Sequence, residues 1–255
     1  MPTRRFFEWG AWCSSPGARY GYGEHDGGWL QSFPYADAEF GLAVVLRGAG
    51  GGSQQATFRN TLEAYVDGAV SRWKRGLPGS VVDRLRDLRL ELDRQFKEAT
   101  EPFFANHFQA YWAALLTDGE RWAHTNMGCQ RVYGFSAKGL RRLSTDDTLE
   151  TGALVLEKGS FRGTPGDLEG FAVHDSPLGE LAGPLPEVLV LVSGLLGKPH
   201  LDDAALERIV QRAVTGDVGA ETIARLVFEQ VAANGPDEQH QWFRHGAVGV
   251  VRPST

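Results

Sequence analysis

The stretch between residues 120 and 147 constrains the fold of this chain most. Over 122–127 apolar and polar residues alternate, as they do in a strand whose two faces lie in different surroundings. One face of that strand is predicted to carry Trp122, His124 and Asn126. A second strand is predicted over 131–135 and a third over 140–143, with a glycine-marked turn between them. The stretch therefore predicts a short antiparallel meander within a β-sheet.

Two pairs of helices are predicted, one on each side of this β-rich middle. Apolar residues recur at helical spacing over 53–75 and 80–99, and again over 202–213 and 220–233. Further strands are predicted at 6–12, 40–47, 109–116, 187–192 and 246–252. Because each helix pair needs a sheet face to cover, the pattern predicts a single layered α+β domain over residues 1–255.

Three glycine-rich segments are expected to be irregular. Residues 17–28 are interpreted as a shaped loop, and the glycines of 48–52 as a turn that leaves the preceding strand. Residues 150–184 are expected to be weakly structured, apart from a short strand at 170–173.

Composition and charge argue against several classes of partner. A net charge of -6 and a pI near 5.7 give no reason to expect a nucleic acid. No stretch reaches the length of a membrane span, and the N-terminal residues lack the apolar core of a signal peptide. Two cysteines, Cys13 and Cys129, make no disulfide framework. A cytoplasmic protein with reduced thiols and no membrane contact is therefore expected.

The stretch that predicts the meander also resembles the metal-dependent serine/threonine protein phosphatases, the phosphatase 2C or PPM family. That family reads roughly ANVGDSRVYLF, a turn, and L..LT.DH, where this chain reads HTNMGCQRVYGFSAKGLRRLSTDD. The matching residues are Gly128, Arg131, Val132, Tyr133, Leu140, Leu143 and Asp146, with Ser144 in place of a threonine. Cys129 stands where the family has an acidic residue. The resemblance implies a four-layer α-β-β-α sandwich of two antiparallel sheets with a helical pair on each outer face.

Two earlier motifs of the family have degenerate counterparts. The motif R…NED corresponds to RYGYGEHD, in which Arg19 lies two residues upstream of the family's phosphate-binding arginine. Asp26 keeps one acid of this motif, and His25 replaces the other. The motif VVADGMGGH corresponds to VVLRGAGG. The resemblance therefore places Arg47 where the family has its metal-bridging aspartate.

Two later aspartates are replaced as well. The motif LLLCSDGL reads VLVLVSGL, and DNITVVV reads HGAVGVV, which puts Ser193 and His245 at aspartate positions. In the family, two divalent cations, manganese or magnesium, activate a water for attack on a phosphoserine or phosphothreonine ester. Such hard cations need carboxylate oxygens, and of the four expected aspartates Asp26 alone is kept. The resemblance thus implies no catalytic residue and no cofactor; manganese or magnesium is expected if the family activity survives.

The vacated metal positions leave other ligands to consider. A residual metal site would draw on Asp26, the Gly48 carbonyl, His25 and His245, and the histidines would suit zinc better than manganese. Histidines that merely fill space are the simpler interpretation. We expect instead that Arg47 takes the place of the metals and bonds Asp26 as a structural cation. Cys129 is interpreted as a buried, inert thiol.

Three functions stay open. The first is a pseudophosphatase: a catalytically inactive domain that acts as a binding or regulatory module in protein phosphorylation signalling, with a kinase or a phosphoprotein as its partner. The second is an active phosphoserine/phosphothreonine phosphatase whose metal ligands come from elsewhere, such as Glu24, Asp37, Glu39 or Asp175. The third is a phosphate- or nucleotide-binding domain that uses Arg19 and Arg47.

Overall fold

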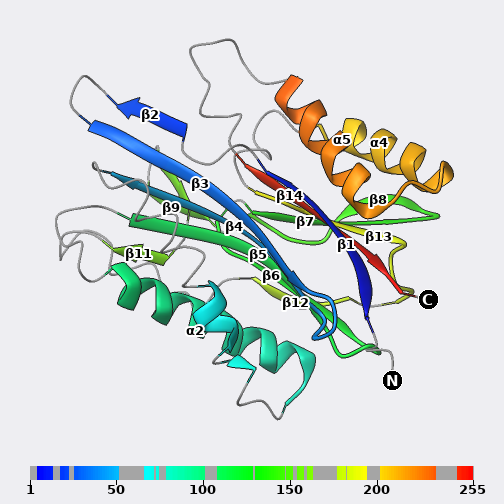
Figure 1. The fold of residues 1–255 in the computed structure, drawn as a ribbon, viewed down its shortest axis with the longest axis horizontal. Helices are drawn as coiled ribbons and strands as arrows, with labels where there is room; N and C mark the ends of the chain where they lie inside the picture. The colour runs from blue at the N-terminus through cyan, green and yellow to red at the C-terminus, as the bar shows by residue number, and fades with distance from the viewer. Residues whose placement is uncertain are drawn as a thin grey trace.

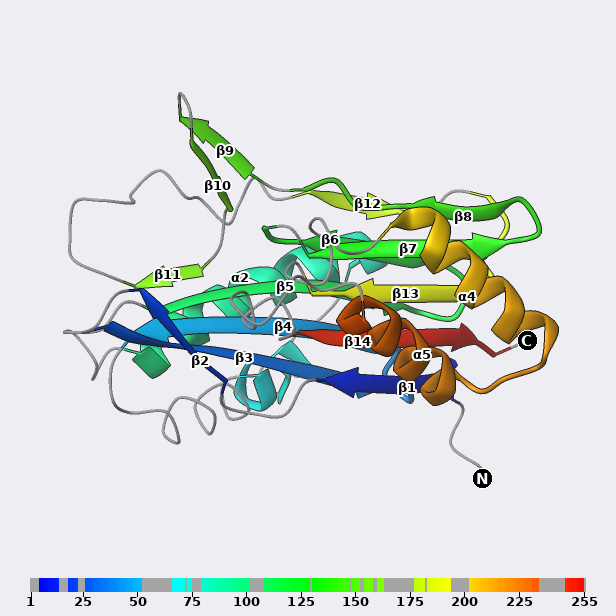
Figure 2. The same cartoon turned by 90° about the horizontal axis from the view of Figure 1, so that it is seen from above.

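Two antiparallel β-sheets packed face to face form the middle of the computed structural model of this chain, with helices on both outer sides (Figures 1 and 2). The structure describes residues 5–13, 18–22, 26–51, 66–71, 73–74, 79–100, 108–128, 130–146, 148–151, 154–157, 160–162, 177–181, 183–193, 202–233 and 246–254. Every strand pairing within these ranges is antiparallel. The predicted layered α+β sandwich is confirmed.

The first sheet joins strands from both ends of the chain. Within the described ranges it has five strands in the order β1-β14-β13-β7-β8. Their bounds are Phe7–Cys13 for β1, Ala247–Pro253 for β14, Val188–Val192 for β13, Arg131–Ser136 for β7 and Gly139–Arg142 for β8. Strand β1, predicted at 6–12, lies at the edge of this sheet, and its Phe7 pairs with Pro253 of β14.

The second sheet has the order β12-β6-β5-β4-β3-β2, and β11 pairs with β5 beyond the end of β6. Their bounds are Leu178–Glu180 for β12, Trp122–Asn126 for β6, Phe108–Thr117 for β5, Leu42–Gly51 for β4, Asp26–Asp37 for β3, Ala18–Tyr22 for β2 and Ser160–Arg162 for β11. A separate hairpin is formed by β9 (Thr148–Thr151) and β10 (Leu154–Glu157).

The helices cover the two outer faces as predicted. On the second sheet lie α2 (Val81–Thr100) and a helical segment at 66–71. On the first sheet lie α4 (Asp203–Thr215), with Asp202 as its N-cap, and α5 (Ala220–Ala233). In the described part of the chain no helix is long and apolar enough to cross a membrane.

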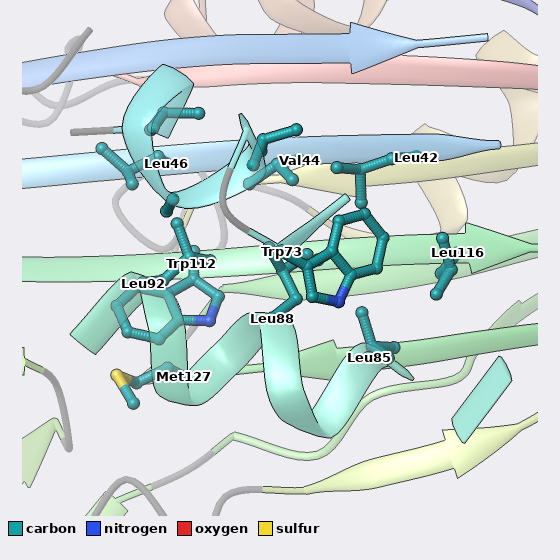
Figure 3. Packing of buried hydrophobic residues seen from close by; sticks show 14 of the residues in the cluster. Leu42, Val44, Leu46, Trp73, Leu85, Leu88, Leu92, Trp112, Leu116 and Met127 are labelled. Carbon is teal, nitrogen blue, oxygen red and sulfur yellow. The ribbon is translucent and has the colours of Figure 1, made fainter. Parts of the chain in front are cut away.

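Strand alternation sorts the apolar side chains of β4 into two cores. Leu42, Val44 and Leu46 face α2, where Figure 3 shows them with Trp73 and the helix residues Leu85, Leu88 and Leu92. Ala43 and Val45 face the other way and pack between the sheets with Leu189 and Leu191 of β13. Odd-numbered residues of β4 therefore belong to the space between the two sheets.

The predicted meander is wrong in one respect, because its first strand belongs to the other sheet. Strand β6 pairs with β5 and β12, whereas β7 pairs with β13 and β8. The two faces predicted for 122–127 are confirmed: Trp122 packs between the sheets, and Ala123 and Met127 pack under α2. Both faces of β6 are thus buried, one against the helices and one against the first sheet. The chain then crosses to the first sheet near Gly128, whose φ is 70°. Alternation predicts faces but not the partners of a strand.

The glycine-rich segments form strands more often than expected. Residues 18–22 and 26–37 pair as the β2–β3 hairpin, and β4 continues through the glycines to Gly51. Both neighbours of β4, β3 and β5, supply hydrogen-bond partners along this run, which compensates for the conformational freedom of glycine. The segment 150–184 carries the short strands β10, β11 and β12. The strand expected at 170–173 lies outside the described residues.

A carboxylate near the start of the chain anchors the last helix. Glu8 Oε1 of β1 accepts a hydrogen bond from the first amide of α5, Ala220 N–H, at 2.8 Å. Two residues on, Gly10 lies directly under that helix: a Cβ at Gly10 would come within 2.0 Å of Glu221 N. Both contacts serve the close approach of α5 to β1, and the carboxylate also complements the positive end of the helix dipole.

Replacing Glu8 with alanine should lower the free energy of unfolding by about 1 kcal/mol, the usual cost of losing a helix N-cap. Urea denaturation followed by circular dichroism measures the change. The matched control is Glu8→Gln, which keeps an acceptor oxygen and should lose less than Glu8→Ala. Equal stability of the alanine variant and the unsubstituted protein would contradict the capping role.

His124 of β6 is a buried titratable group at the β12 edge of the second sheet. Its side chain is 8% exposed, and its ring lies against Gly179 of β12. Nδ1 is buried and has no hydrogen-bond partner among the described residues. Burial, and next the positive charge of Arg141, lower the pKa of His124 from 6.5 to about 4. The imidazole is therefore neutral in the folded protein at neutral pH.

This depressed pKa makes the protein less stable in mild acid. Between pH 6.5 and about pH 4 the unfolded chain binds a proton at His124 that the folded chain does not, so stability falls as the pH falls through this window. The full effect is about 3 kcal/mol. We expect His124→Gln to lose less stability than the unsubstituted protein between pH 7 and 4, as measured by urea midpoints. Parallel pH profiles for the two proteins would contradict this.

Candidate functional site

Arg47 lies on the inner face of the second sheet. It follows Ala43 and Val45 at two-residue spacing along β4, and both of these pack between the sheets. Its side chain is 8% exposed, and its guanidinium carbon lies 4.9 Å from the centre of the Tyr111 ring. Tyr111 of β5 is its cross-strand neighbour on one side, and Ser32 of β3 is its neighbour on the other. The structure thus buries a cation between two sheets.

The first sheet approaches this region through β14. A Cβ at Gly249 would lie 2.9 Å from Val45 Cγ2, so the backbone of β14 rests on the β4 side chain. Figures 1 and 2 show β4 and β14 running in opposite directions. Ala247, two residues before Gly249, therefore lies toward Arg47, which is two residues after Val45. The beginning of β14 and the later part of β4 meet at the same end of the sandwich.

Ser193 lies at this end of the first sheet. It follows β13 directly and is 0% exposed. Its Oγ accepts a hydrogen bond from Ala247 N–H at 3.0 Å, and its own N–H donates to the Ala247 carbonyl at 3.0 Å. The hydroxyl is thus a structural partner of β14 that keeps its own O–H to donate elsewhere. Among the described contacts, no side chain that could act as a general base contacts the Ser193 hydroxyl.

Two further polar atoms on the inner face are buried without a partner among the described residues. Ser32 Oγ stands across from Arg47 on β3 and makes no hydrogen bond there. Asn126 Oδ1 of β6 is also unmatched, although its Nδ2 donates to the Thr145 carbonyl at 2.6 Å. A buried unmatched polar atom is costly, and a bound water or ion is a common explanation. This end of the sandwich therefore contains buried polar atoms that could still form hydrogen bonds.

The described part of this site does not fit a pair of hard dications. Such ions need several carboxylate oxygens, whereas the described side chains here contribute a guanidinium and neutral hydroxyls. Among the described residues no cluster of three or more His, Cys, Asp or Glu is placed to hold a metal ion. Gly48, a predicted ligand through its carbonyl, is buried in the β4 ladder between Gln31 and Ala110.

The predicted bond between Arg47 and Asp26 is wrong in this register. Asp26 begins β3 and pairs with Tyr22, whereas the residue across from Arg47 is Ser32. Six residues of extended strand separate Asp26 from Ser32, which is about 20 Å along the hairpin. That distance exceeds the combined reach of the two side chains. The prediction took residues 17–28 as a loop beside Arg47, whereas Asp26 begins a long strand whose hairpin turn lies at 38–41, three residues later than a pairing of Asp26 with Arg47 would need.

Arg19, the other predicted phosphate-binding residue, lies on β2 across from Trp29, so β3 separates its strand from that of Arg47. The structure does not bring these two strands together as neighbours. The remaining predicted site residues lie outside the described part of the chain: Glu24, His25, Cys129, Asp175 and His245.

Asp37 and Glu39 lie too far from Arg47 to supply ligands for a metal site there. Asp37 ends β3 at the hairpin turn, across from Leu42, and Arg47 is five residues, or about 17 Å, further along β4. Its carboxylate forms an ion pair with Lys74 and accepts the Phe40 N–H at 2.9 Å. Burial alone would raise the pKa of Asp37, but these hydrogen bonds lower it below its ordinary value. Glu39 is exposed on the turn itself.

Several residues that match the phosphatase motif form a structural network away from Arg47. Arg131 donates to Asp146 in a bidentate pair, with Nε–Oδ1 at 3.0 Å and Nη2–Oδ2 at 2.9 Å. The Tyr133 hydroxyl donates to Asp203 Oδ1, in the first turn of α4, at 3.0 Å. The hydrogen bonds with Asp146 raise the pKa of Arg131, and burial raises that of Tyr133 to about 12. Tyr133 connects β7 to α4, and Arg131 connects β7 to the segment after β8; the motif match alone indicates neither contact.

Comparison with known proteins gives no match in sequence and many in structure. No family model matches the chain, and none of the curated proteins matches it. Among solved structures, the Mycobacterium tuberculosis serine/threonine phosphatase PstP/Ppp superposes with a TM-score of 0.64 at 14% identity, over 97% of this chain and 98% of that one. The catalytic domain of PstP in complex with two manganese ions gives 0.62 at 15% identity, over 97% of each chain.

PppA of Pseudomonas aeruginosa, described as a key regulatory component of T6SS, gives a TM-score of 0.64 at 17% identity, over 98% of each chain. At such identities the likeness concerns architecture, and it covers nearly the whole chain. The two antiparallel sheets, the outer helices and these superpositions agree: the chain has the fold of the PPM-type, phosphatase 2C-like serine/threonine phosphatases.

Proposed function

We propose that this chain is a catalytically inactive phosphatase 2C-like domain that acts as a binding or regulatory module in protein phosphorylation signalling. The observation that carries the proposal is the buried position of Arg47 on the inner face of β4. The family resemblance places a metal-bridging aspartate there. A guanidinium in that place repels the cations that the carboxylate would hold.

The positive charge of Arg47, in place of an aspartate, strongly disfavours the binding of dications nearby. Two unit charges at 4 Å interact by about 4 kcal/mol at the effective dielectric constant typical near a protein surface, and each dication carries twice that charge. Ser193, at a second aspartate position, offers a neutral hydroxyl that already accepts the Ala247 N–H. The residues present thus oppose metal-assisted hydrolysis at two of the positions that it would need.

A protein partner is proposed from the likeness in fold rather than from a described contact. Several solved neighbours are named as serine/threonine phosphatases, and one as a regulatory component. A domain that keeps this fold and loses the chemistry would act by binding, with a kinase or phosphoprotein in the cytoplasm as the proposed partner. An active phosphatase with manganese or magnesium remains the alternative that the assay below tests.

Hydrolysis of p-nitrophenyl phosphate in millimolar manganese should be no faster with the unsubstituted protein than with Asp26→Ala. The reason is that the described residues around Arg47 supply no carboxylate for a two-metal site, and Asp26 lies too far along β3 to add one there. Release of nitrophenolate measures the rate, and calorimetric titration with manganese alone measures binding directly. A manganese-dependent turnover that Asp26→Ala abolishes would show that this domain is an enzyme.

A further inference from the structure

We infer that the edge strand β12 detaches from β6 when His124 takes up a proton, while the rest of the domain stays folded. His124 lies beneath β12 on the inner face of β6, the face that also carries Trp122. The inference is independent of the proposed function, because it concerns the β12 edge of the second sheet and not the Arg47 position on β4. It rests on the cover over His124, the charge beside it and the attachment of β12.

The ring of His124 is covered on its β12 side by a residue without a side chain. Gly179 is its cross-strand neighbour, and a Cβ at Gly179 would come within 2.7 Å of His124 Nε2. Because the His124 side chain is 8% exposed, its imidazole becomes fully hydrated only when this cover moves away. The cover is short, since β12 has only three residues.

A proton on His124 is unfavourable while β12 is in place. Nδ1 is buried and has no hydrogen-bond partner among the described residues. In the imidazolium both ring nitrogens are donors, so Nδ1 would become a buried donor without an acceptor, on a ring that carries a charge. Leaving such a group buried costs more than leaving a neutral one, and hydration after opening would remove that cost.

The groups around the ring do not offset this charge. Strand β8, which lies along the same side of the sandwich as β12 in Figure 2, carries Arg141, whose positive charge also opposes protonation of His124. The other neighbours on this face are uncharged: Leu115 on β5, Gly179 on β12, and Trp122 and Asn126 two residues away on β6. No carboxylate among the described residues acts on the ring to stabilise the imidazolium.

Strand β12 is attached to the sheet along one side. Among the described strands it pairs with β6 alone. At its two ends, Thr125 Oγ1 donates to the Pro177 carbonyl at 2.7 Å, and Leu181 N–H donates to the Trp122 carbonyl at 2.8 Å. Its apolar side chains, Leu178 and Leu181, are only partly buried. Segments with little buried apolar surface open locally at free energies below that of global unfolding.

Opening couples to pH because it restores the ordinary pKa of His124. That pKa is about 4 in the closed form, through burial first and then Arg141, and 6.5 when the imidazole is hydrated. The open form therefore binds the proton more tightly, and the closed form loses its advantage as the pH falls below 6.5. Lowering the pH from 7 to 5 should raise the ratio of open to closed molecules about twentyfold.

Amide hydrogen exchange, resolved by NMR at pH 7 and pH 5, tests this opening in the full chain. After correction for the intrinsic exchange rate, the protection of Leu181 N–H, which bonds to β6, should fall about twentyfold. Met127 N–H bonds to the Trp112 carbonyl on the β5 side and is the internal control, so its protection should stay the same.

Three variants separate the proton on His124 from other effects of acid. His124→Gln cannot take up this proton, so the protection of Leu181 N–H should be the same at both pH values. Arg141→Gln removes the neighbouring positive charge and should show a fall smaller than twentyfold. The matched control is Arg86→Gln on the exposed face of α2, which should behave like the unsubstituted protein.

Unchanged protection of Leu181 N–H in the unsubstituted protein would overturn the inference. So would an equal loss of protection at Met127, because the opening would then be that of the whole domain. The same twentyfold fall in His124→Gln would assign the effect to another group. If that variant does not fold, equal falls in Arg141→Gln and Arg86→Gln would overturn the inference in its place, since Arg141 lies at an exposed position.

Discussion

The close contact of β14 with β4 sets the geometry on which the rest of the structure depends. Gly249 has no room for a side chain, because Val45 Cγ2 and the Trp9 ring already lie within 2.9 Å of the place where a Cβ would stand. At this position the two sheets meet, and apolar side chains fill the space with 0% exposure at Val45. Two residues further along β4 the packing changes from apolar to polar. Arg47 is buried there, with its guanidinium carbon 4.9 Å from the centre of the Tyr111 ring.

The architecture could be predicted from sequence because it follows from periodicity. The 3.6-residue pattern of 80–99 and the alternation of 122–127 each predict which face is buried, and burial decides the layers. Pairing partners follow from the whole fold, which is why β6 was assigned to the wrong sheet. The glycines of 48–51 were misjudged for a related reason, since neighbouring strands on both sides stabilise residues of low strand propensity.

The candidate site was predictable in part. The position of Arg47 on a buried strand follows from the run that precedes it, and the structure places it between the sheets. Its partner could not be predicted, because the distance between Arg47 and Asp26 depends on where the hairpin turns rather than on the number of residues between them. The residues of the motifs also differ in what they contact: Arg131, Tyr133 and Asp146 form hydrogen bonds that hold elements together, whereas Arg47 and Ser193 stand where the family resemblance places aspartates.

The pairing of β1 with β14 has a consequence for how this domain joins to others. Phe7 lies beside Pro253, so the chain enters and leaves the domain at one corner, as the N and C labels in Figure 1 show. That corner is at the far end of β14 from Ala247, about 20 Å away along the strand. A tether, a tag or a neighbouring domain attached on either side would therefore leave the Arg47 end uncovered. The same closeness would let the whole domain be inserted into a loop of a host protein without separating the ends of that loop.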